Sequence, residues 1–322
     1  MSAQIILFDD SAFKYTGVWQ ENDKGEIVSY HTSAQLEFGF TGSEIKLYAK
    51  TENEENILFL LDGDEISPEK ESENIFNYST SCGEHILKVV TKRHAKIYFK
   101  GVSVSDGERI FATKDNYYIQ FIGDSITDAC PGFSTAVADN LKVDYSIVSL
   151  CGIALVDKWG WYKLIDGADE RIGMETTYFS LQNPQESVEL SAYEFKNCRK
   201  PDAFVIYLGT NDYISRSEQA EEGNCDFFAE RYYSFVKKIK NQFGEKPFFI
   251  LQTHRKGDNV RVKAINKAYE LIKVDTKTAY LLNPFEWDIE LTSDGVHPSA
   301  NGYKTMAENV TAFLKEKLHF GN

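Results

Sequence analysis

From about Tyr117 onward, short apolar runs alternate with longer segments that carry apolar residues along one side. Two of the longer segments, 224–243 and 301–318, repeat their apolar positions every three or four residues, as amphipathic helices do. The predicted strands are YYIQFIG (117–123), DYSIVSLCG (144–152), AFVIYLGT (203–210), PFFILQTH (247–254) and AYLLNP (279–284). Strands that alternate with helices form a parallel sheet covered on both faces, so we predict a three-layer α/β/α domain. Ligands of such domains bind beyond the carboxyl ends of the strands.

Residues 1 to about 108 have a different pattern, with many short strand-like runs separated by turn residues such as Asp62-Gly63. Closely spaced short strands are typical of an all-β sandwich or jelly roll. The chain has 322 residues, which is more than one core usually needs. We therefore predict an all-β jelly-roll-like sandwich domain at 1–110 and the α/β domain at 111–322. The irregular region 153–200 is expected to act as a lid or a substrate wall.

Charge and composition exclude several classes of partner. The net charge is −14 and neither part has a basic stripe, so we expect no nucleic acid and no membrane as a partner. A small neutral or weakly polar substrate suits this charge better than a polyphosphate. The six histidines show no metal-ligand spacing and no glycine-rich nucleotide motif occurs, so no metal and no cofactor are expected.

The cysteines and the N-terminal residues bear on location. The five cysteines are odd in number and form no CxxC pair, which favours free thiols in a reducing compartment. The first residues lack a basic segment followed by a long apolar one, and no run of about 18 apolar residues occurs. We expect a cytoplasmic protein, or a secreted one if a signal peptide has been removed. The sequence predicts no oligomeric state.

A serine follows the first strand of the α/β part directly, in Gly123-Asp124-Ser125. On a tight turn at the carboxyl edge of a sheet, its hydroxyl would be presented as a nucleophile. For the tripeptide taken alone, the alternative is an ordinary turn without a catalytic role, because turns favour all three residue types.

A carboxylate and an imidazole lie three residues apart near the other end of the chain, in Ser-Asp-Gly-Val-His-Pro (293–298). On a bent turn, Asp294 can reach Nδ1 of His297, fix its tautomer and stabilise the imidazolium while the other nitrogen faces a serine. The alternative is a surface histidine in a loop.

Two further segments end strands and could supply hydrogen-bond donors. Asn211, in Gly209-Thr210-Asn211-Asp212, can donate an N–H to a developing oxyanion, and Gly152 can donate its backbone N–H. The alternatives are an Asx turn or helix cap for Asn211 and an ordinary turn glycine for Gly152.

As an ordered set, these four segments resemble the blocks of the SGNH (GDSL-type) hydrolase superfamily over residues 117–318. The resemblance implies a flavodoxin-like α/β/α fold with Ser125 as nucleophile, His297 as general base and acid, and Asp294 as its orienting carboxylate. It also implies an oxyanion hole made by the N–H groups of Ser125 and Gly152 and the side chain of Asn211. A β-sandwich that leads into such a block resembles carbohydrate esterase family two, whose members deacetylate plant polysaccharides.

The resemblance implies a serine esterase that hydrolyses short acyl esters, above all acetyl esters on carbohydrates, through an acyl-enzyme. An oligosaccharide or other small-molecule acyl ester would be its substrate. The alternatives are a lipase or lysophospholipase, a thioesterase or an acyltransferase of the same superfamily, and a non-catalytic carbohydrate-binding protein. Candidate substrate-binding residues are Trp159, Trp161, Trp287 and His254.

Overall fold

The computed structural model describes residues 5–52, 54–92, 95–129, 132–163, 171–181, 190–196, 199–214 and 224–319. The chain divides into two compact units. The first comprises the described residues within 1–115, 181–183 and 191–199, and the second comprises the others. The predicted boundary at 110/111 falls inside strand β11 (Ile110–Phe111), which pairs with Phe40 and Gly39 of the first unit.

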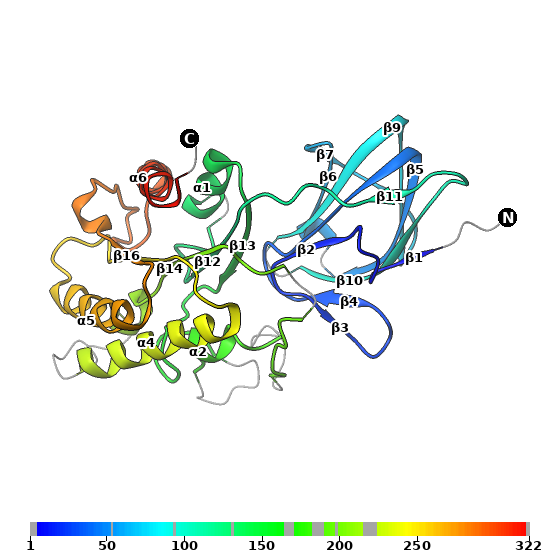
Figure 1. Cartoon of the computed structure of the whole chain (residues 1–322). Coiled ribbons are helices and arrows are strands. Elements are labelled where there is room, and N and C mark those ends of the chain that lie inside the picture. The colour runs from blue at the N-terminus through cyan, green and yellow to red at the C-terminus, as the bar shows by residue number, and fades with distance from the viewer. Residues whose placement is uncertain are drawn as a thin grey trace. The chain divides into compact units, whose positions relative to one another are not determined.

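The first unit is all β, as expected, and every strand pair in it is antiparallel (Figure 1, blue to cyan). Its sheet has the order β3-β4-β10-β5-β9-β6-β7, with β1, β2, β8 and β11 added at its sides. Besides β11 and the 3-10 turn Glu54–Asn56, its elements are β1 (Ile6–Leu7), β2 (Lys14–Thr16), β3 (Gln20–Glu21), β4 (Ile27–Ser29), β5 (Gln35–Glu52), β6 (Ile57–Leu61), β7 (Asp64–Ile66), β8 (Glu69–Ser72), β9 (Ile75–Thr91) and β10 (Lys96–Val104).

Aromatic side chains fill the core of the first unit. Phe38 and Phe40 lie two residues apart on β5, so their side chains point to the same face of the strand, and both are fully buried. The Phe13 ring meets Phe38 and Phe99 edge-on at 5.1 Å. The described residues 181, 191–196 and 199 belong to this unit as well, and the Tyr193 hydroxyl accepts the backbone N–H of Trp19.

The second unit contains a five-stranded parallel sheet with helices on both faces, which confirms the α/β prediction (Figure 1). The sheet order is β13-β12-β14-β15-β16, with helices α1 and α6 on one face and α4 and α5 on the other. The strands are β12 (Tyr118–Gly123), β13 (Asp144–Ser149), β14 (Ala203–Tyr207), β15 (Phe248–Leu251) and β16 (Ala279–Leu282). The helices are α1 (Phe133–Leu141), α2 (Met174–Thr177), α3 (Thr210–Ile214), α4 (Asn224–Phe243), α5 (Asn259–Asp275) and α6 (Ala300–Leu318), with a 3-10 turn at Pro284–Glu286.

The central strand β12 places the predicted motifs side by side. Gly123, its last residue, is in register with Ser149 of β13 on one side and Tyr207 of β14 on the other. The chain therefore leaves the sheet at three adjacent points, just before Ser125, Gly152 and Asn211. The strand order also reverses at β12, which is where open α/β sheets bind their ligands.

Candidate active site

Ser125 lies on a tight turn that close packing dictates. The Asp124 carbonyl accepts the N–H groups of Thr127 (3.0 Å) and Asp128 (2.9 Å), and the Asp124 carboxylate accepts that of Ile126 (3.0 Å). A Cβ at Gly123 would lie 2.0 Å from the Thr127 hydroxyl oxygen, so only glycine fits there. The turn leaves the Ser125 side chain half-buried at the carboxyl end of β12.

The Asp294 carboxylate organises the turn that carries His297. Its Oδ1 accepts the N–H groups of Val296 (2.8 Å) and His297 (3.0 Å), and its Oδ2 lies 2.6 Å from Nδ1 of His297. The hydrogen bond from the His297 side chain, then that from Thr292, holds the pKa of Asp294 well below its usual range. The carboxylate is therefore ionised at neutral pH, and the hydrogen on His297 belongs on Nδ1.

The serine and the histidine meet although they lie 172 positions apart. Oγ of Ser125 is 2.8 Å from Nε2 of His297. With Nδ1 protonated toward Asp294, Nε2 is the nitrogen that accepts the serine hydrogen. The side chains of His297 and Asp294 are 39% and 48% exposed, so the site opens to solvent.

Candidate hydrogen-bond donors follow strands that end at the same edge of the sheet as the strand before the serine. Among the described residues, no protein acceptor takes the N–H of Ser125 or of Gly152. Gly152 has a φ of 78°, a conformation that favours glycine. The Asn211 side chain donates to the Ile153 carbonyl (2.9 Å), which leaves the second hydrogen of its amide.

A family model described as GDSL-like Lipase/Acylhydrolase matches residues 119–310. The chain belongs to this family. The resemblance inferred from the four segments is confirmed. Among curated proteins, the cellulase/esterase CelE of Acetivibrio thermocellus is 21% identical over 96% of the chain, and the chain spans 40% of that protein's length.

Solved structures share the fold of the whole GDSL-like chain at low identity. A family two carbohydrate esterase from Cellvibrio japonicus matches with a TM-score of 0.75 and 14% identity, over 99% of both chains. An acetyl xylan esterase (Est2A) from the rumen bacterium Butyrivibrio proteoclasticus matches with a TM-score of 0.74 and 16% identity, over 99% of this chain and 100% of that one. At these identities the likeness establishes the architecture, a sandwich followed by an SGNH domain, and the details of activity need arguments from the site.

The three candidate tryptophans of this GDSL-like chain have different surroundings. Trp161 is 54% exposed, and its backbone N–H donates to the Gly152 carbonyl (2.9 Å). The Trp159 ring instead contacts Phe227 at 5.6 Å, and Trp287 packs against the core of the second unit. Of the three, Trp161 has the most exposed side chain, and the Arg171 guanidinium lies over its ring at 5.8 Å from the centroid.

His254 is enclosed by the protein, whereas the substrate-binding role expected of it requires an accessible side chain. It follows β15, is 3% exposed, and has both ring nitrogens engaged within the protein. Nδ1 faces the Tyr207 hydroxyl, and Nε2 lies 2.8 Å from the carbonyl oxygen of Val296. Burial, then the charge of Arg261, lowers the pKa of His254 to about 4. This enclosed imidazole bonds protein groups through both nitrogens, and its bond to the Val296 carbonyl can hold the turn of His297.

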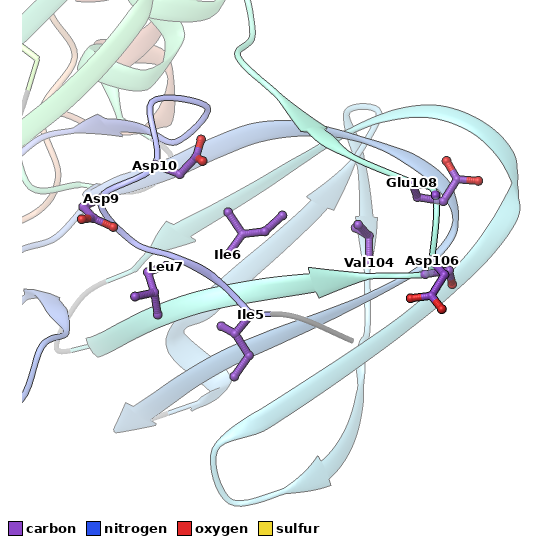
Figure 2. A pocket seen from close by; sticks show the side chains of 10 residues that line it. Ile5, Ile6, Leu7, Asp9, Asp10, Val104, Asp106 and Glu108 are labelled. Carbon is purple, nitrogen blue, oxygen red and sulfur yellow. The ribbon is translucent and has the colours of Figure 1, made fainter. Parts of the chain in front are cut away.

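The first unit has a pocket of about 760 Å³ between β1 and the turn that follows β10 (Figure 2). Its carboxylates lie at two ends: Asp9 and Asp10 at one, Asp106 and Glu108 at the other (Figure 2).

Within the described parts of the chain, no group of three or more His, Cys, Asp or Glu side chains could hold a metal ion. None of the helices described is long and apolar enough to cross a membrane.

Proposed function

We propose that Ser125 and His297 hydrolyse carboxylic esters through an acyl-enzyme. Oγ of Ser125 attacks the ester carbonyl carbon while Nε2 of His297 takes the hydroxyl proton. The tetrahedral intermediate then breaks its bond to the alcohol, which leaves with the proton from His297. Water attacks the acyl carbon in the second half of the reaction, gives a proton to His297, and releases the acid as Ser125 regains its hydrogen. The contact of 2.8 Å between Ser125 and His297 carries this proposal.

Two other parts of the site have roles in this scheme. The Asp294 carboxylate orients the His297 ring and stabilises the imidazolium that forms when Ser125 attacks. The N–H groups of Ser125 and Gly152 and the second amide hydrogen of Asn211 stabilise the oxyanion. One such donor contributes about 3–4 kcal/mol to the transition state.

A short acyl group on a sugar is the substrate that suits this site. The exposed imidazole and carboxylate leave room for a bulky, hydrated alcohol, whereas a lipase needs an apolar trough for its acyl chain. The indole of Trp161 is 54% exposed and belongs to a residue whose backbone N–H donates to the Gly152 carbonyl, so the ring is available to stack on the apolar face of a sugar. The fold of family two carbohydrate esterases and of an acetyl xylan esterase supports acetyl as the acyl group.

Release of acetate from acetylated oligosaccharides tests this proposal, with the Ser125→Ala variant as the blank. Nitrophenyl acetate and nitrophenyl palmitate assayed in parallel separate a deacetylase from a lipase. We expect acetate release and nitrophenyl acetate turnover, both lost in Ser125→Ala and kept in Ser105→Ala, which alters an exposed serine of the first unit. Preference for the palmitate ester would contradict the choice of acyl group, and oligosaccharide binding without any ester cleavage would indicate a carbohydrate-binding protein.

Replacing Trp161 tests the sugar part separately. We expect Trp161→Ala to raise KM for acetylated oligosaccharides and to leave KM for nitrophenyl acetate unchanged, because the small ester has no sugar ring to stack. An equal change for both substrates would mean that Trp161 acts through Gly152 and not through the sugar.

A further inference from the structure

Asp212 is a fully buried carboxylate that the reaction scheme leaves unused. It follows Asn211 directly on α3, and none of it is exposed. Placing a carboxylate in the protein interior is costly unless hydrogen bonds compensate it. Burial, with a smaller contribution from the charge of Asp124, raises the pKa of Asp212 to about 7 against the opposing hydrogen bonds. A residue kept at such a cost has a structural or functional task.

The Asp212 carboxylate holds two consecutive backbone N–H groups of the segment that follows β13. Oδ2 accepts from Leu155 at 2.9 Å and Oδ1 from Val156 at 3.1 Å. Both contacts are charge-assisted when the carboxylate is ionised, which makes them stronger than bonds between neutral groups. They fix the segment three and four residues after Gly152, whose N–H is one of the proposed oxyanion donors.

Neighbouring bonds hold the same segment by its carbonyl groups. The Asn211 amide donates to the Ile153 carbonyl (2.9 Å), and the N–H groups of Met174 and Glu175 donate to those of Ala154 (2.8 Å) and Leu155 (3.0 Å). Three donors thus bond carbonyl oxygens of this segment, and the Asp212 carboxylate accepts two of its N–H groups.

We propose that Asp212 is a positioning residue, which fixes the segment 152–156 so that the Gly152 N–H points at the oxyanion. The proposal rests on the function proposed above, since it assigns a role within the same site. Under this proposal, the adjacent residues Asn211 and Asp212 of α3 have separate tasks. Asn211 donates to the oxyanion and to Ile153, while Asp212 holds the second donor segment in place.

The isosteric variant Asp212→Asn tests this proposal most cleanly. Its side chain keeps the shape but offers one oxygen to two N–H groups and turns an NH₂ group toward one of them. A small displacement of a transition-state group costs up to about 100-fold in rate. We therefore expect kcat for nitrophenyl acetate to fall between about 10-fold and 100-fold, with KM changed less than twofold. Inhibition by phenylboronic acid, which forms a tetrahedral adduct on Ser125, should weaken in parallel with kcat.

Asp144→Asn is the matched control, because Asp144 is also buried and lies at the opposite end of β13. We expect this control to affect thermal stability and to leave kcat and boronate affinity unchanged. The proposal is overturned if Asp212→Asn keeps wild-type kcat and boronate affinity, or if Asp144→Asn loses as much of both. An inactive wild-type enzyme that boronate does not inhibit would instead refute the proposed function.

If Asp212→Asn does not fold, hydrogen exchange on the wild-type protein tests whether Asp212 holds the N–H groups of Leu155 and Val156. We expect the amide hydrogens of Leu155 and Val156 to exchange far more slowly than those of an unstructured peptide. Exchange at the unstructured rate would show that Asp212 does not hold these two groups and would overturn the proposal.

Discussion

Nε2 of His254 donates to the carbonyl oxygen of Val296 at 2.8 Å, and Val296 directly precedes His297. The other ring nitrogen faces the hydroxyl of Tyr207, the last residue of β14. His254 thus connects the sheet to the turn that carries the proposed general base. Because the lowered pKa keeps this ring neutral, it can donate through Nε2 and accept through Nδ1 at the same time.

We predict that His254→Ala lowers kcat by about 10-fold to 100-fold and leaves KM for nitrophenyl acetate nearly unchanged. The turn of His297 loses its tie to the sheet, while nothing that contacts the substrate is removed. His254→Gln, which keeps a donor for the Val296 carbonyl, should restore part of kcat. Steady-state kinetics of the three proteins measure this, and a rise in KM with unchanged kcat would assign His254 to substrate binding.

The same residue makes the stability of the fold depend on pH. The pKa of His254 is about 4 in the folded protein against 6.5 as its ordinary value, so the unfolded chain binds a proton more readily. The stabilisation is fully present above pH 6.5 and is lost as the pH falls through about 4; the difference corresponds to roughly 3 kcal/mol.

Chemical denaturation of wild type and His254→Gln at pH 7.5, 5.5 and 4.0 measures this contribution. The free energy of unfolding of the wild type should fall more steeply with acidification than that of the variant. Parallel curves for the two proteins would mean that His254 is not held neutral in the fold.

Much of the second unit could be predicted because its signals are local. Apolar runs of strand length and helices with a period near 3.6 identify the parallel sheet, and Ser125, Gly152 and Asn211 all follow strands whose carboxyl ends meet at one edge. The tasks of Asp212 and His254 could not be predicted in this way. Their partners, Leu155, Val156 and the carbonyl of Val296, lie 42 to 57 positions away, and only the folded chain brings backbone groups together at such separations.

The first unit shows a second limit of local patterns. Its many short strands indicate an all-β fold, but nothing in the irregular region 153–200 indicates that Leu181 and Tyr193 bond His31 and Trp19. Side-chain bonds of this kind depend on the path of the chain and leave no periodic signal. Within the same region, the described residues 153–163 and 171–175 are joined by backbone hydrogen bonds.

Replacing Asp294 tests the orienting carboxylate. We predict that Asp294→Asn lowers kcat by on the order of 10² to 10⁴, because the amide cannot stabilise the imidazolium and permits the wrong tautomer. The nearby Asp288→Asn is a control, since that exposed carboxylate contacts neither His297 nor Ser125. A kcat within twofold of the wild type in Asp294→Asn would indicate that Ser125 and His297 act as a dyad.

Replacing Asn211 tests the proposed oxyanion donor. Loss of one such donor costs about 10² to 10³ in kcat, and we expect Asn211→Ala to fall in that range with little change in KM. Asn309→Ala is a matched control, because the Asn309 amide also donates to a backbone carbonyl, that of Thr305 at 2.8 Å. If both variants lose activity equally, the effect of Asn211 is structural.

Covalent labelling of Ser125 tests the central claim most directly. The protein is treated with a fluorophosphonate, digested, and analysed by mass spectrometry, with Ser125→Ala and His297→Ala treated alongside. The account predicts one modified peptide that contains Ser125, no modification in Ser125→Ala, and labelling slowed by orders of magnitude in His297→Ala. Wild-type protein that stays unlabelled, or a label on another serine that persists in Ser125→Ala, would contradict it.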